Sequence, residues 1–314
     1  MNRGLNGVFE SNLITLGVVG IFILPIYKQY FRPVFSYRIL KRMLVFGIPT
    51  IFTLLCMRVI DISDRYVILY LLGTDAKAEL GKYSVAYTLG MVGVMVFVHS
   101  FRIAWQPFFL SVRNNPEARS LFSRVATYYA LFIGIVFLGI TLFRHELFHL
   151  YAIVPVVSFA YIFFGFYIIM LAGIFIQEKT RYLPVVTFTA AALNVGLNFI
   201  FIPEFGIIGA AYTTLIAYIV MVVLMYAISN AVYRVYYDFK RLSAVFVLTL
   251  VPITISLLVK PSNVILDYLF RCVLLIIPVI IYLSSNFFNH GELNYLKKVL
   301  LKITAFFQFS RIEK

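Results

Sequence analysis

The sequence has 314 residues, a length that would ordinarily suit about two soluble domains. Its composition excludes them, because 62% of the residues are hydrophobic and only 13% are charged, against roughly 25% charged residues in soluble domains. The 27 Lys and Arg outnumber the 13 Asp and Glu, for a net charge of +14. The sequence predicts an all-α polytopic membrane protein with no cofactor, no metal site and no nucleic acid partner.

Nine apolar segments are each long enough to cross a bilayer, which takes about 20 helical residues. They occupy 12–31, 44–72, 83–109, 125–143, 150–176, 183–202, 206–230, 243–259 and 268–287. Eighteen of the 27 Lys and Arg fall in one set of alternating loops, including the C-terminal tail, and five in the other. By the positive-inside rule, this asymmetry predicts a cytoplasmic C-terminus and an N-terminus of this chain on the outside.

The second apolar segment contains four charged residues: Arg58, Asp61, Asp64 and Arg65. A charge at the bilayer centre costs about 2.5–3.5 kcal/mol, so these side chains must pair, line a water-filled cavity or lie near the membrane surface. Counted from residue 44 at about 1.5 Å per residue, Asp64 and Arg65 reach the outer interface, whereas Arg58 and Asp61 remain at membrane depth.

Two roles for these charges are compatible with the sequence. In the first, Arg58 and Arg65 bind an anionic head group in a cavity, since the planar guanidinium donates paired hydrogen bonds to phosphate. Asp61 would then restrain Arg58 or carry a coupling proton or cation. In the second, the charges form an internal ladder that only neutralises the helix, and Asp64 caps it at the interface.

The third segment contains Arg102 with no obvious acidic partner in that segment, so we expect Arg102 to face an anion in a cavity or a carboxylate of another helix. His99 and Gln106 are candidates to line the same cavity, although a lone histidine in an apolar helix is more often a satisfied core residue. In the sixth segment, Asn194 and Asn198 lie four positions apart. Such amides usually hydrogen-bond to neighbouring helices, and lining a cavity is the alternative.

Several different short motifs follow one another along the chain between about residues 30 and 290. They are Gly47-Ile48-Pro49, Asp64 to Leu69, Gly81 to Tyr87, Phe101 to Phe108, Glu178-Lys179-Thr180, and the series Asn194, Asn198, Ile202, Pro203, Gly206, Gly209, Ala210, Ala211 and Thr214. Together they resemble the O-antigen or capsule repeat-unit flippases of the multidrug/oligosaccharidyl-lipid/polysaccharide exporter superfamily, in particular their C-terminal portion.

The resemblance implies an architecture of two six-helix lobes followed by two extra helices. On that plan, 1–42 hold the last helix of a first lobe and a basic linker, and 43–236 form a six-helix lobe. The two extra helices occupy 237–289. In 290–314, apolar residues recur at spacings of 3 and 4 with lysines away from that stripe, which predicts a basic amphipathic cytoplasmic tail lying on membrane lipids. An N-terminal lobe is then expected as a missing partner.

The resemblance also implies a function. Such proteins translocate polyprenyl-diphosphate-linked oligosaccharide repeat units across the bacterial cytoplasmic (inner) membrane, without enzymatic chemistry and together with other polysaccharide-assembly proteins. A cation-coupled multidrug antiporter of the same superfamily is one alternative, although the apolar segments hold four Arg against two Asp. A membrane glycan polymerase or acyltransferase is another, and such enzymes usually need a larger outside loop bearing acidic residues.

Overall fold

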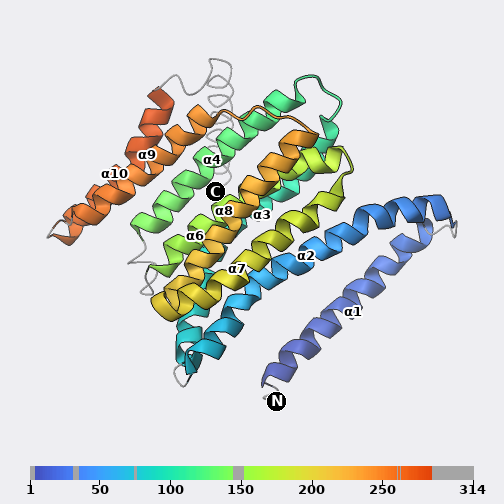
Figure 1. Ribbon diagram of the computed structural model, residues 1–314, viewed down its shortest axis with the longest axis horizontal. Coiled ribbons are helices and arrows are strands. Elements are labelled where there is room, and N and C mark those ends of the chain that lie inside the picture. The colour runs from blue at the N-terminus through green and yellow to red at the C-terminus, as the bar shows by residue number, and fades with distance from the viewer. Residues whose placement is uncertain are drawn as a thin grey trace, which may run out of the picture. The chain divides into compact units, whose positions relative to one another are not determined.

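The computed structural model describes residues 4–30, 35–73, 76–143, 152–259, 261 and 263–284. These residues form nine long α-helices and one short 3₁₀ helix, with no strand among them (Figure 1). The elements are α1 (Gly4–Tyr30), α2 (Tyr37–Leu71), α3 (Ala76–Ser111), α4 (Ala118–Leu142), α6 (Ile153–Ile176), η2 (Thr180–Tyr182), α7 (Leu183–Phe205), α8 (Ile207–Val232), α9 (Phe239–Leu258) and α10 (Val264–Ser284).

Nine of the helices in the described part of the chain are long and apolar enough to cross a membrane. The prediction of an all-α, multi-pass membrane protein with nine spans is therefore confirmed. The predicted amphipathic tail at 290–314 lies outside the described residues.

The chain divides into two compact units, Met1–Val45 and Phe46–Lys314. The first unit contains α1 and the first residues of α2. The second contains the rest of α2 and all the later helices, and the following paragraphs concern this second unit.

Helix α6 lies at the centre of the second unit and packs against α3 on one side and α8 on another. It is apolar all round, with residues buried on every face, as expected for a helix enclosed by other helices. Gly90 of α3 allows the close approach of α3 and α6, because a Cβ atom there would lie 2.7 Å from the carbonyl oxygen of Val154. Ser158 donates a hydrogen bond of 3.0 Å to the carbonyl oxygen of Gly90 at the same crossing.

Helices α7 and α8 form a tight hairpin joined by a single residue, Gly206, whose φ of 61° is a left-handed conformation that glycine adopts without strain. Gly209 follows on α8, where any side chain would overlap the carbonyl oxygen of Phe201. The next two residues, Ala210 and Ala211, are fully buried. Small residues thus bring the two backbones together, as is common between membrane helices.

Helices α9 and α10 pack on α4 (Figure 1). Arg271 of α10 pairs with Asp267 and donates a 2.9 Å hydrogen bond to the carbonyl oxygen of Leu142, the last residue of α4. This charged group therefore holds α10 against α4.

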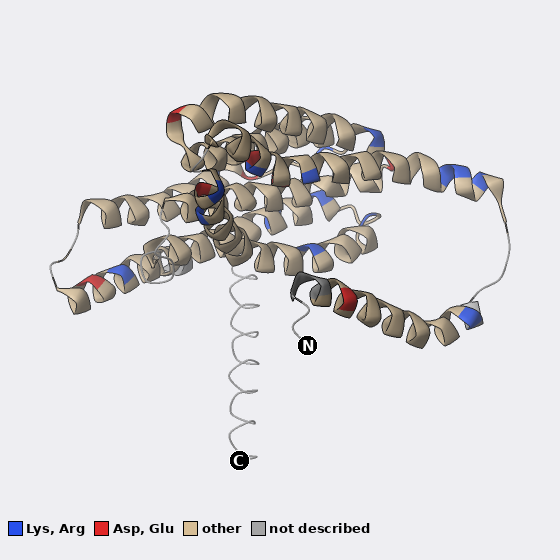
Figure 2. Ribbon diagram, turned by 90° about the horizontal axis from the view of Figure 1, so that it is seen from below, with Lys and Arg blue, Asp and Glu red and all other residues tan. Residues whose placement is uncertain are grey.

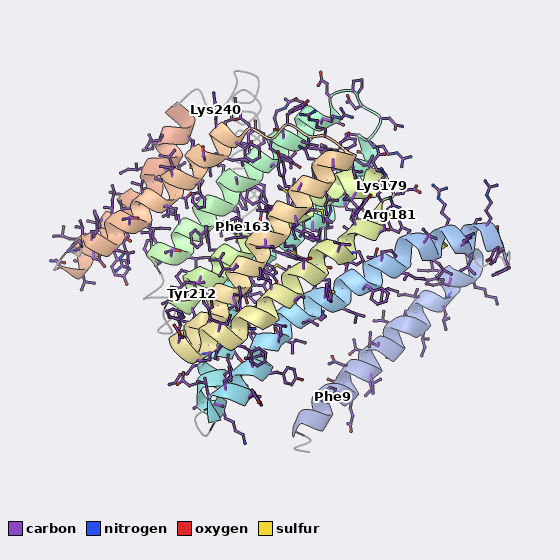
Figure 3. The ribbon with its side chains drawn as sticks, viewed as in Figure 1. Phe9, Phe163, Lys179, Arg181, Tyr212 and Lys240 are labelled. Atoms are coloured by element: carbon purple, nitrogen blue, oxygen red, sulfur yellow. The ribbon has the colours of Figure 1, made fainter. Side chains whose placement is uncertain are left out.

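Charged residues lie mainly towards the ends of the helices, which leaves long uncharged stretches between them (Figure 2). Lys179 and Arg181 lie at the end of the bundle where α7 begins, and Tyr212 lies towards the opposite end (Figure 3). Since α7 and α8 are antiparallel, α8 ends at the same side of the bundle as Lys179 and Arg181.

Candidate functional site

The candidate site begins with the α2 charge cluster, by which we mean Arg58, Asp61, Asp64 and Arg65. Helix α2 continues to Leu71, seven residues beyond Asp64 and thirteen beyond Arg58. At about 1.5 Å per residue, Arg58 lies roughly 20 Å from that end of the helix. The cluster therefore sits well inside a membrane-spanning helix.

Asp61 is held by two tyrosines of neighbouring helices. Tyr161 of α6 and Tyr218 of α8 each donate a 3.3 Å hydrogen bond to the same carboxylate oxygen, Oδ1. The hydroxyls of Tyr161 and Tyr87 lie 2.9 Å apart. Because Tyr161 gives its single hydroxyl hydrogen to Asp61, Tyr87 of α3 donates to Tyr161. The carboxylate of Asp61 thus connects α2 to three other helices.

Asp64 is fully buried, and its carboxylate accepts hydrogen bonds from the hydroxyl of Tyr83 on α3 and from the backbone N–H of Arg65. Asp64 does not cap the end of α2, because the helix continues to Leu71 and the side chain turns into the bundle. In this structure Asp64 has no exposed surface from which to line an open cavity.

Arg65 is about one-third exposed and makes several local contacts. Its guanidinium lies over the ring of Tyr87, 5.1 Å from the centroid, and 3.7 Å from the carboxylate of Asp64. It also donates to the backbone carbonyl of Asp61. These contacts hold the guanidinium of Arg65 beside the ring of Tyr87.

Arg58 contrasts with Arg65, because 77% of its side chain is exposed. Its one ion pair within the described residues is a 3.9 Å contact with Oδ2 of Asp61. A single contact at this distance leaves most of the five N–H donors of the guanidinium free for another acceptor.

The α3 polar face consists of His99, Arg102 and Gln106, spaced three and four positions apart. All three are exposed, and none makes a hydrogen bond or ion pair with another described residue. His99 is therefore not a satisfied core histidine. Arg102 has no carboxylate from another helix beside it within the described part of the chain.

The structure does not bring Arg102 next to the α2 charge cluster. Tyr87, which contacts Arg65, lies fifteen residues before Arg102 on α3. This spacing corresponds to about 22 Å along the helix. The α2 charge cluster and Arg102 of α3 are therefore two separate basic positions.

Asn194 and Asn198 are fully buried in a polar network between α7 and α8. The hydroxyl of Thr213 donates to the amide oxygen of Asn198, and the amide of Asn194 contacts the hydroxyl of Thr213 at 3.5 Å. Ser63 of α2 donates a 2.8 Å hydrogen bond to Asn194. Both asparagines thus contact neighbouring helices and have no exposed surface.

Sequence reasoning missed the tyrosines that hold the two aspartates: Tyr83, Tyr87, Tyr161 and Tyr218. Each is almost fully buried. Tyr83 and Tyr87 lie four positions apart in an apolar helix, and a hydroxyl buried in a bilayer needs a partner. From the sequence one could therefore have predicted that these hydroxyls have hydrogen-bond partners. Which residues are the partners depends on how separate helices pack.

Comparison with known proteins gives one match. Residues 1–151 match a family model described as polysaccharide biosynthesis protein. That segment includes the α2 charge cluster and the α3 polar face. No curated protein and no solved structure matches the chain. The first part of this chain is therefore similar to proteins of polysaccharide biosynthesis, which supports a role in the synthesis or export of polysaccharide.

Proposed function

We propose that this chain is part of a flippase that moves polyprenyl-diphosphate-linked oligosaccharide repeat units across the bacterial cytoplasmic membrane, for the assembly of a surface polysaccharide such as O-antigen or capsule. The observation that carries the proposal is the exposed guanidinium of Arg58 at membrane depth, next to an aspartate that tyrosines already hold.

Arginine at this depth is costly against lipid, by about 2.5–3.5 kcal/mol on insertion scales. Arg58 is mostly exposed, and Arg102 is exposed without any ion pair to a described residue. Both side chains are stable in the membrane if the surface beside them is wet. A hydrated vestibule along α2 and α3 satisfies this requirement.

The division of contacts within the α2 charge cluster supports an anionic substrate. The carboxylates of Asp61 and Asp64 accept hydrogen bonds from tyrosines, so their charge is directed into the bundle. The guanidinium of Arg58 projects out of it. The most exposed charge of the cluster is therefore positive, and a diphosphate offers the oxygen acceptors that a guanidinium binds in pairs.

A vestibule needs a second wall, and we propose that a partner lobe faces α2 and α3. Rocking of the two lobes would expose the basic positions first to one side of the membrane and then to the other. The separation of Arg58 and Arg102 along the helices suits such a path, because the diphosphate would meet Arg102 and Arg58 at different depths. The polyprenyl tail would remain in the lipid.

One observation favours a second candidate, a cation-coupled antiporter. Asp61 remains about one-third exposed and is surrounded by aromatic hydroxyls, an environment that suits an organic cation. Under this hypothesis Asp61 binds the substrate, and Arg58 restrains the carboxylate in the empty site.

The two candidates are separated by an export assay in cells that depend on the full-length protein. We expect Arg58→Ala and Arg102→Ala to abolish export of the polysaccharide, with lipid-linked repeat units accumulating in the inner leaflet. Arg113→Ala, in the loop between α3 and α4, is the control and should leave export unchanged. Immunoblots of the membrane fraction verify expression.

Normal export by both variants would contradict the proposal. Normal export combined with new drug sensitivity in Asp61→Asn cells would favour the antiporter.

A further inference from the structure

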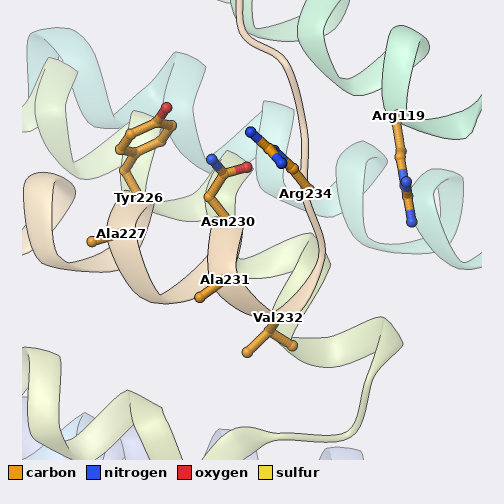
Figure 4. A pocket seen from close by; sticks show the side chains of 7 residues that line it. All are labelled: Arg119, Tyr226, Ala227, Asn230, Ala231, Val232 and Arg234. Atoms are coloured by element: carbon orange, nitrogen blue, oxygen red, sulfur yellow. The ribbon is translucent and has the colours of Figure 1, made fainter.

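A pocket of about 530 Å³ opens beside the last turns of α8, where the first turn of α4 approaches them (Figure 4). Its polar lining comes from Arg119 of α4, Tyr226 and Asn230 of α8, and Arg234, which follows α8. Two alanines and Val232 complete it. In Figure 4, Asn230 and Arg234 lie close together, and Arg119 projects from a different helix. This site is separate from the α2 charge cluster.

The lining of this pocket is positive and contains no acidic residue. Within the described part of the chain, neither Arg119 nor Arg234 forms an ion pair. The nearby acid Asp238 is already 3.3 Å from Arg241. The N-cap residue of α4, Glu117, makes no side-chain hydrogen bond to the first turn of the helix. The lining of the pocket therefore carries two positive side chains and no negative one.

Both guanidiniums are held by stacking, which leaves their hydrogen-bonding edges free. Arg119 lies over the ring of Tyr233 and Arg234 over that of Tyr236, each 5.0 Å from the centroid. Stacking uses the flat face of the guanidinium and not its N–H groups. Two arginines fixed in this way can donate to one ligand at a reduced cost in side-chain entropy.

Asn230 adds a third donor of fixed orientation. Its Oδ1 atom accepts a 2.9 Å hydrogen bond from the backbone N–H of Val235. This bond fixes the orientation of the amide, with its NH₂ group on the side away from Val235. That NH₂ group donates to no described residue. Two guanidiniums and an amide form a set of donors only, which matches a tetrahedral anion with several acceptor oxygens.

The position of the pocket indicates what kind of molecule carries that anion. It lies where a membrane-spanning helix ends, on the side of the bundle that bears Lys179 and Arg181 (Figure 3). Ala227 and Ala231 give the pocket an apolar wall along α8. Phosphate groups of membrane lipids lie at this level, and basic pockets beside membrane helices recognise anionic headgroups. We propose that this pocket binds the phosphate of an anionic phospholipid.

The test uses the purified full-length chain in a neutral detergent, titrated with phosphatidylglycerol or with phosphatidylcholine. Native mass spectrometry counts the bound lipid. We expect the protein to retain phosphatidylglycerol. The double variant Arg119→Gln/Arg234→Gln should bind it about a hundredfold more weakly, because it loses two charge-assisted hydrogen bonds, each worth about tenfold. Arg113→Gln/Arg181→Gln removes the same net charge at positions outside the pocket, and this variant should bind like the unmodified protein.

A second variant, Asn230→Asp, keeps the acceptor that Val235 uses and places a carboxylate in the pocket. It should weaken phosphatidylglycerol binding to a similar extent. Equal losses in the two double variants would overturn the proposal, as would equal retention of phosphatidylcholine. Competition by millimolar inorganic phosphate or diphosphate would assign the pocket to a soluble anion and reject the lipid. The assay measures binding without transport, so its outcome is independent of the proposed flippase activity.

Discussion

The hydroxyl of Tyr83 on α3 donates a hydrogen bond to the fully buried carboxylate of Asp64 on α2. Asp61, one turn earlier, is held in the same way by Tyr161 and Tyr218. The acidic residues of α2 therefore attach the helix to the bundle, and the most exposed charged side chain on this part of the helix is Arg58. The two signs of charge have different structural roles.

We predict that Tyr83→Phe destabilises the protein by about 1–3 kcal/mol, because it removes the hydroxyl and leaves a buried carboxylate oxygen without this partner. Thermal unfolding in detergent measures the loss. In a double-mutant cycle, Tyr83→Phe should cost much less when Asp64 is already Asn. Additive effects of the two substitutions would show that the hydrogen bond contributes nothing.

The α7–α8 hairpin gives a prediction of opposite sign at two glycines. Gly209→Ala should lower the melting temperature, because the new Cβ overlaps the carbonyl oxygen of Phe201 and such overpacking costs about 1–3 kcal/mol. At Gly196 of α7, by contrast, a Cβ atom would have open space within 4 Å. Gly196→Ala should therefore be neutral or stabilising by up to about 1 kcal/mol. Equal effects at both positions would contradict the packing of this hairpin.

Ser63 and Asn194 provide a test of the contact between α2 and α7. Ser63→Ala and Asn194→Ala should each destabilise the protein, because each removes the hydrogen bond between these residues. The loss of stability in the double variant should be smaller than the sum of the two single losses. The difference should be about 0.6 kcal/mol, the average for such hydrogen bonds in membrane proteins. Ser100→Ala is the control, because its hydroxyl bonds only within α3. The melting temperatures of the variants provide the measurement. Strict additivity of the Ser63 and Asn194 effects would argue against the contact.

The alternative of a neutralising ladder on α2 predicts a different result from anion binding. We expect Arg58→Gln to abolish export with a stability change below about 1 kcal/mol, because its ion pair is exposed. Exchange of the charges by Arg58→Asp with Asp61→Arg should not restore export, since the tyrosines need an acceptor at position 61. Restored export in the exchanged variant, at a normal membrane level, would favour the ladder.

The helices were predictable from the sequence because a bilayer imposes a length and an apolar composition on each span. For Asn194 and Asn198, the sequence left two roles open, and the structure shows both side chains buried with hydrogen-bond partners on neighbouring helices. The tyrosine partners of Asp61 and Asp64 were not identified, because residues from four separate helices meet only after packing fixes their relative height and rotation. The burial of Asp64 was not predicted either, because it too depends on the position of Tyr83 on a separate helix.

The most direct measurement is the water accessibility of position 58. With Cys56 and Cys272 replaced by alanine, Arg58→Cys should react rapidly with a membrane-impermeant maleimide in intact cells or inverted vesicles. Val247→Cys, on an exposed apolar position of α9, is the lipid-facing control and should react slowly. A lipid-linked diphosphate substrate should protect position 58. Labelling of Arg58→Cys as slow as that of Val247→Cys from both sides would contradict a hydrated path beside this arginine.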